Sequence, residues 1–219
     1  MILTCIFINP WICDFAAMNL WSRPLGLLKV AEYMSQFNIR TRLLDCMDIF
    51  QKKPYGTGKY PRETVEKPEV LKCIPRYFKR YGISLSEFTE RLESLMPYDF
   101  VFITSIMSYW YPGVQKAIDM VRNVTPHVPI ILGGIYATLF HEHASTHSHA
   151  DFVYKGNIKE NIKYVLEGFG IRLNKKTTDK KRIYAPPTKP YYQLNLYGSY
   201  PFAPILTSQG CPYRCSYCA

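Results

Sequence analysis

The sequence predicts an α/β domain built on a doubly wound parallel sheet, because two kinds of segment alternate along residues 1–170. Short apolar runs, rich in β-branched and aromatic residues, are followed by stretches in which apolar residues recur every three or four positions. Apolar strands that alternate with amphipathic helices form a parallel sheet covered on both faces. The composition, 47% hydrophobic and 20% charged, is that of an ordinary globular domain.

The first part of this domain contains two strands and one helix. Ile2–Ile8 is a continuous apolar run, typical of a buried strand, and Thr41–Ile49 contains a second strand. Between them, residues 23–37 have helical periodicity. The apolar residues on one face of that helix are Leu27, Val30, Ala31 and Met34.

The second part adds three strands, at Asp99–Ile106, Val128–Gly134 and Asp151–Gly156. A helix begins near Pro112, and its apolar stripe consists of Val114, Ala117, Ile118, Val121 and Val124. A last helix within residues 157–170 ends in glycine, and its apolar residues are Ile158, Ile162, Val165, Leu166 and Phe169. Ligands of such sheets bind beyond the carboxyl ends of the strands, so we expect the functional site there.

Residues 50–98 interrupt the alternation and form an insertion. Their first part is rich in Pro, Gly and Lys and indicates a loop. Their second part ends in a helix, which Ser84 and Glu87 begin as a capping box. The insertion is either a surface excursion or a lid over the site.

The composition changes after residue 170. Residues 171–201 are basic and rich in proline and tyrosine, which indicates a linker. Phe202–Gly210 then predicts the first strand of a second domain, over residues 202–219.

Three cysteines follow that strand with the spacing C-x3-C-x2-C: Cys211, Cys215 and Cys218. Thiolates are soft ligands that suit iron–sulfur clusters and zinc, and a structural zinc site takes four protein ligands. A cubane cluster held by three cysteines keeps one iron free for another ligand.

The segment "TSQGCPYRCSYCA" resembles the signature loop of the radical S-adenosylmethionine (SAM) superfamily. The resemblance implies that Cys211, Cys215 and Cys218 hold a [4Fe-4S] cluster and that SAM chelates the fourth iron. Reductive cleavage of SAM then gives a 5′-deoxyadenosyl radical. Tyr217 matches the aromatic position that lies near the SAM adenine, and residues 202–219 match the start of a (β/α) barrel.

Residues 1–170 resemble the Rossmann/flavodoxin-like, B12-binding-type domain that precedes the barrel in one radical SAM subgroup. The similar segments are "RPLGLLKVAEYM", "DFVFITSIMSYWYPGV", "PIILGGIYAT" and "ADFVYKGNIKENI". The candidate cobalamin-binding residues are Thr104, Ser105, Ser108, Gly133 and Gly134. Glycines without a Cβ let a flat ligand approach the backbone. The alternative for these residues is a tight turn and hydroxyls that cap the next helix.

Two features depart from the family pattern. The loop after the first strand lacks the D-x-H-x-x-G histidine, so cobalamin would bind without that axial ligand. The usual Gly-Glu-Gly-Glu is replaced by residues 156–159, Gly-Asn-Ile-Lys, with Glu160 next. Both departures weaken the expectation of an intact cobalamin pocket.

Charge and cysteine content limit the expected partners and cellular compartment of the protein. A formal net charge of +10 without a nucleic-acid motif favours a solvated basic surface over nucleic-acid binding. Seven unevenly spaced cysteines are typical of a reducing cytoplasm, and the sequence has no apolar run of about 18 residues that would span a membrane. The expected partners are a small-molecule or lipid-like substrate and an electron donor such as flavodoxin or ferredoxin.

Two alternative functions remain open at this point. A radical SAM methylthiotransferase of RNA or protein would hold a second cluster, for which Cys13, Cys46 and Cys73 are the candidates, although buried or incidental cysteines explain them better. A non-catalytic corrinoid-binding or interaction domain is the third hypothesis. Because the motif opens a barrel that the sequence does not continue, we expect a truncated chain that is inactive alone.

A histidine-rich segment, "FHEHASTHSH", also suggests a metal site. His143 and His147 have the spacing i, i+4, with His141 and His149 beside them. It is not H-E-x-x-H, and a solvated helix and loop explain it better.

Overall fold

The computed structural model describes residues 2–17, 23–48, 60–156, 161–174 and 196. Its centre is a five-stranded parallel sheet in the spatial order β3-β1-β6-β7-β8. The strands are β1 (Leu3–Asn9), β3 (Ile39–Asp45), β6 (Phe100–Ser105), β7 (Ile130–Gly134) and β8 (Phe152–Val153). The five predicted strands are confirmed, and their order, second-first-third-fourth-fifth along the chain, is that of flavodoxin-like sheets.

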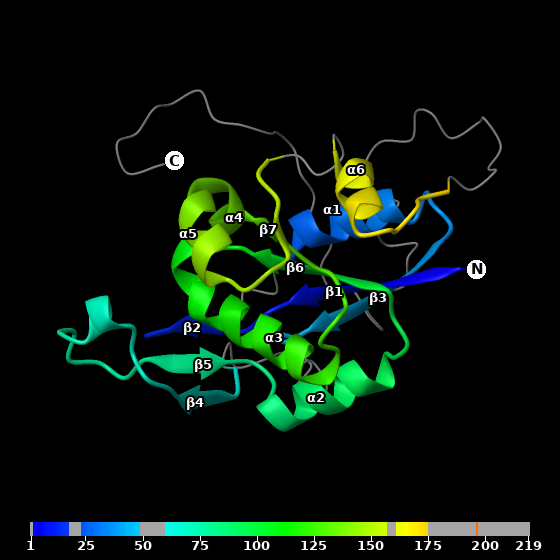
Figure 1. Ribbon diagram of the computed structural model, residues 1–219. Coiled ribbons are helices and arrows are strands. Elements are labelled where there is room, and N and C mark those ends of the chain that lie inside the picture. The colour runs from blue at the N-terminus through cyan, green and yellow to red at the C-terminus, as the bar shows by residue number, and fades with distance from the viewer. Residues whose placement is uncertain (1, 18–22, 49–59, 157–160, 175–195, 197–219) are drawn as a thin grey trace.

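Helices cover both faces of the sheet (Figure 1). One face packs against α1 (Leu25–Met34) and α6 (Ile162–Gly168). The other packs against α2 (Leu85–Ser94), α3 (Tyr111–Val124), α4 (Ile135–Leu139) and α5 (His141–His147). The alternating side chains of β1 divide between these two cores, since Cys5 and Phe7 face α1 while Ile6 and Ile8 face α2 and α3. The predicted α/β sheet with helices on both faces is therefore confirmed.

A second, smaller sheet lies beside the first and was not expected from the sequence. It is antiparallel, in the order β2-β5-β4, from β2 (Ile12–Asp14), β5 (Lys79–Tyr81) and β4 (Arg62–Thr64). A 3-10 helix, η2 (Glu69–Leu71), lies in the loop between β4 and β5. Part of residues 50–98 thus pairs with the segment that follows β1, and this arm projects from the body of the molecule in Figure 1.

Helix α2 leads from β3 to β6, so it is the crossover between two neighbours of β1. Its capping box is half formed. The Ser84 hydroxyl accepts a hydrogen bond from the Glu87 N–H at 3.1 Å, whereas the Glu87 carboxylate pairs with Arg91 at 2.6 Å. Phe88 is fully buried against Trp11, whose ring centroid lies 4.7 Å away.

The described residues contain no helix that is both long and apolar enough to cross a membrane. Residues 175–195 and 197–201 of the predicted linker and the whole of 202–219 lie outside the described residues. The expectations placed on them stay predictions.

Candidate functional site

The carboxyl ends of the parallel strands bring together four of the five candidate cobalamin residues. Thr104 is paired with Gly133, and Ser105 with Gly134, at the ends of neighbouring strands β6 and β7. Ser108 follows at the start of the 3-10 helix η3 (Ser108–Trp110). This end of the sheet, at the left in Figure 1, is called the carboxyl edge below.

The two glycines at the end of β7 have different surroundings. A Cβ on Gly133 would meet no atom of the described residues within 4 Å, so the described part of the chain leaves the space beside this backbone open. A Cβ on Gly134 would lie 2.5 Å from the Ser105 carbonyl oxygen and 2.8 Å from the Thr104 hydroxyl. Gly134 also has φ 94° and ψ −166°, a conformation that only glycine adopts readily. Gly134 therefore serves the fold, and Gly133 leaves room for a ligand.

The three hydroxyls at this edge do not cap helices. Ser105 donates to the Met107 carbonyl at 2.7 Å, and neither η3 nor α3 has a side-chain cap. Thr104 is 8% exposed, and its hydroxyl has no hydrogen-bond partner among the described residues. A buried hydroxyl without a partner costs free energy, and a bound polar group would recover it.

Exposed apolar side chains lie on the segments that follow β6 and β7. Helix α4 contacts both η3 and β6, so the loop after β6 and the helix after β7 form one surface. Its exposed apolar side chains are Ile106, Met107, Tyr109, Ile135, Leu139 and Phe140. We call this surface the edge patch. Clustered exposed apolar residues mark sites for ligands or partners.

A buried polar cluster at the ends of β1 and β3 was missed by the sequence reasoning. The Asn9 amide donates to the Asp45 carboxylate at 2.7 Å, and the Met47 N–H donates to the same oxygen at 2.8 Å. The Arg23 guanidinium lies 4.0 Å from Asp45 and 3.1 Å from Asp48. Polar residues that end adjacent parallel strands could have signalled this cluster, because those ends share one edge.

The cysteines that the structure describes lie in different environments. Cys5, Cys13 and Cys46 are buried, whereas Cys73 is exposed on the arm that contains β4 and β5. Among the described residues, no group of three or more His, Cys, Asp or Glu comes together to hold a metal ion. Cys13, Cys46 and Cys73 are thus not gathered in the structure. Cys211, Cys215, Cys218 and Tyr217 lie outside the described residues.

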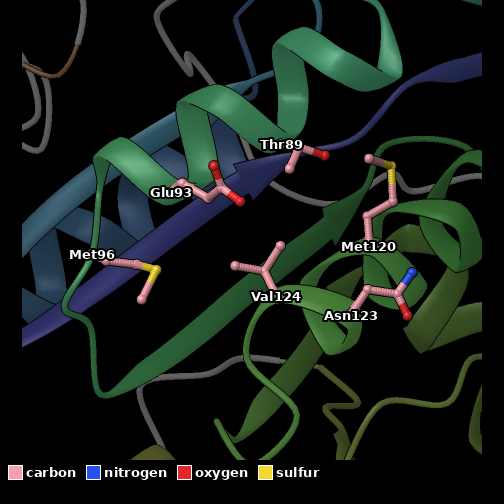
Figure 2. A pocket seen from close by; sticks show the side chains of 6 residues that line it. All are labelled: Thr89, Glu93, Met96, Met120, Asn123 and Val124. Atoms are coloured by element: carbon pink, nitrogen blue, oxygen red, sulfur yellow. The ribbon is translucent and has the colours of Figure 1, made fainter.

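Two hollows lie at the opposite, amino edge of the sheet. One, of about 660 Å³, separates the last turns of α2 and α3 (Figure 2). Its lining residues are Thr89, Glu93, Met96, Met120, Asn123 and Val124. The other, of about 530 Å³, lies by Asp99, His127 and Arg172. Neither coincides with the candidate residues at the carboxyl edge.

Burial keeps several thiols and phenols in their neutral form. It raises the pKa of Cys13 from its ordinary value of 9.0 to about 12, and the pKa of Tyr136 from 10.0 to about 12, where nearby Tyr111 acts in the same direction. The pKa of Tyr60 also rises to about 12, mainly through burial and secondarily through Asp45. Burial raises the thiol pKa of Cys5 and Cys46 as well.

These shifts predict a loss of stability at alkaline pH. The unfolded chain releases protons near pH 9 to 10, while the folded chain keeps them to about pH 12. Stability is thus complete below pH 9 and falls as the pH rises toward 12. We expect the free energy of unfolding, from urea titrations at fixed pH, to fall by at least ~2 kcal/mol between pH 9 and pH 11. Cys13→Ala should flatten this dependence, and a constant stability up to pH 11 would contradict the assignment.

Comparison with models of known protein families found no match to this chain, and a search among curated proteins also found none.

Proposed function

We propose that the protein is a radical SAM enzyme whose α/β domain binds a corrinoid. The observation that carries the proposal is the C-x3-C-x2-C spacing of Cys211, Cys215 and Cys218, three thiolates that can hold a cubane cluster and leave one iron for SAM. A [4Fe-4S] cluster held there would pass one electron to SAM, whose cleavage gives methionine and a 5′-deoxyadenosyl radical. The electron comes from a donor such as flavodoxin or ferredoxin, and the substrate is a small or lipid-like molecule.

The carboxyl edge supports the corrinoid part of the proposal. A corrin is a flat, largely apolar ring with polar amide groups around its rim. The open space beside Gly133 would admit such a ring close to the backbone, and the edge patch would cover its apolar surface. The Thr104 hydroxyl, which lacks a partner among the described residues, would bond an amide of the rim.

Anaerobic reconstitution with iron and sulfide tests the cluster. For the unmutated chain we expect about four irons per chain and the EPR signal of a reduced cluster, as a [4Fe-4S] cubane would give. Cys211→Ala, Cys215→Ala and Cys218→Ala should each abolish both. Cys73→Ala removes an exposed cysteine of the described chain and is the matched control, which should keep the cluster. Retention of four irons in Cys215→Ala, or their loss in Cys73→Ala, would refute the ligand assignment.

Titration with hydroxocobalamin, followed by gel filtration, tests the corrinoid site. We expect co-elution and a shift of the visible bands for the parent protein. Gly133→Leu should prevent both without unfolding the domain, because a Cβ at this position meets no atom of the described residues within 4 Å. Thr104→Val should weaken binding by about tenfold, the equivalent of one hydrogen bond. Unchanged corrinoid bands would remove cobalamin from the proposal and leave the cluster test unaffected.

The edge patch also favours a second candidate, a binding domain without catalysis of its own. An exposed apolar surface at the ligand-binding edge of a parallel sheet suits a partner protein or another flat ligand as well as a corrinoid. This candidate is supported if the chain binds cobalamin or a partner but assembles no cluster. It is refuted if cluster reconstitution succeeds and SAM is cleaved.

A further inference from the structure

The histidines of α5 and its flanks share one hydrogen-bonding arrangement. Each of the four has its Nδ1 atom within hydrogen-bond distance of a protein oxygen: Ala137 O for His141, Tyr136 Oη for His143, His143 O for His147 and Asp119 Oδ1 for His149. None of the four Nε2 atoms has a hydrogen-bond partner within the described part of the chain. The ring edges that carry Nε2 are therefore available.

Two of these rings lie against each other. His143 and His147 are one turn apart on α5, both exposed, and their ring centroids are 4.3 Å apart with an angle of 18° between the planes. The His147 Nδ1 must carry the proton, because it donates to the His143 carbonyl at 3.1 Å. In the neutral ring the lone pair is then on Nε2, and a metal ion binds this tautomer through Nε2.

The partner of His143 is unusual for an exposed histidine. Its Nδ1 lies 2.7 Å from the hydroxyl of Tyr136, which is 1% exposed and fixed in the core. The Tyr111 and Tyr136 rings also contact the His143 ring, at centroid distances of 5.2 and 5.8 Å. A hydroxyl can accept from Nδ1–H, so His143 can hold the same tautomer as His147.

We propose that His143 and His147 form a two-histidine site for a divalent transition metal ion of the nickel, copper and zinc class. Imidazole nitrogens suit these ions, and residues four apart on a helix offer two of them to one ion. Water takes the other coordination positions, since no third ligating side chain joins the pair among the described residues. Because the two rings are stacked, they must turn about χ2 before both Nε2 lone pairs can point at one ion.

Tyr136 gives the site a feature that a chance pair of surface histidines lacks. A partner on the second ring nitrogen fixes the tautomer and orientation of a metal-binding histidine, and its removal typically lowers metal affinity 10- to 100-fold. Tyr136 supplies that partner from the core, while the helix backbone supplies it for His147. Tyr136 is thus a positioning residue for the site.

Titration of the full chain with Ni²⁺, observed on the histidine ring protons by NMR, tests the proposal. The chain has five histidines, so each signal can be assigned from single His→Gln variants. We expect paramagnetic Ni²⁺ to broaden the signals of His143 and His147 first and together. His143→Gln or His147→Gln should abolish this step, whereas His127→Gln and His149→Gln should retain it. Because the signals are resolved by residue, nickel bound to cysteines does not obscure the result.

Tyr136→Phe should weaken nickel binding at this pair by about tenfold without unfolding the protein, since only the hydroxyl is removed. Tyr98→Phe is the matched control, because it removes another core hydroxyl, bonded to Thr125 at 2.8 Å, and should leave the affinity unchanged. Broadening that spreads equally over all five histidines would overturn the site. An unchanged affinity in Tyr136→Phe would overturn the role of Tyr136.

Discussion

Gly134→Ala is expected to lower the free energy of unfolding by about 3 kcal/mol or more. Two costs combine at this position. The backbone has φ 94° and ψ −166°, where a side chain is strained, and the new Cβ would lie 2.5 Å from the Ser105 carbonyl oxygen of the neighbouring strand. Relief would require β6 and β7 to separate at their ends, which would break the pairing of Ser105 with Gly134. Chemical denaturation monitored by circular dichroism measures the loss.

Gly133→Ala is the control for that experiment, because the same chemical change one residue earlier meets no atom within 4 Å in the part of the chain that the structure describes. We expect the free energy of unfolding to change by no more than about 1 kcal/mol in either direction, as is usual for a Gly-to-Ala change in a strand. Equal losses in the two variants would mean that strand propensity, rather than the conformation of Gly134, sets the stability of this edge. The pair therefore separates a glycine that the fold needs from one that it does not.

The sequence predicted the five parallel strands and the helices α1, α2, α3 and α6 because each of them is defined by local pattern, whereas the short helix α4 was not predicted. β1 is an unbroken apolar run, and Pro112 in the first turn of α3 precedes a regular apolar stripe. Burial on both faces of the sheet requires this pattern, so local sequence and tertiary structure agree. The edge on which the candidate residues meet followed from strand direction alone.

The small antiparallel sheet could not be predicted in the same way. Its strands have three residues each, too few for a period to be recognised, and β4 is exposed along its whole length. β2 and β5 pair across more than sixty positions of sequence, as Ile12 pairs with Tyr81. The Lys- and Pro-rich composition between them indicated a loop, and this composition hid the strand pairing of β4, while residues 49–59 of the segment lie outside the described residues.

The candidate site was predicted only as far as strand ends and residue types allow. Gly133 and Gly134 are both glycines, so the sequence does not distinguish them. Their surroundings beside β6 do. The hydroxyls were interpreted as either ligands or helix caps. Their hydrogen bonds leave Thr104 unpartnered within the described residues and commit Ser105 to the Met107 carbonyl. Distinctions of this kind depend on long-range packing, which no local pattern contains.

Asp45→Ala is expected to lower the free energy of unfolding by about 3 kcal/mol, since it removes one partner from a buried charged cluster. The Asp45 side chain is 3% exposed and that of Arg23 is 5% exposed. Without the carboxylate, the Asn9 amide and the Met47 N–H lose the acceptor that they share, and the Arg23 guanidinium loses a nearby counter-charge. Urea denaturation of the variant measures the cost.

Asp45→Asn separates the two contributions to that cost. An asparagine oxygen can still accept from Asn9 and Met47, so only the charge is lost, and we expect about half of the effect of alanine. Asp119→Ala removes a carboxylate of the same kind from the surface, where its partner is the exposed His149, and should change stability by less than about 0.5 kcal/mol. If Asp45→Ala costs no more than Asp119→Ala, the cluster contributes nothing to the fold. The geometry of the β1 and β3 ends would then have to come from the backbone pairing of Asn9 with Asp45 alone.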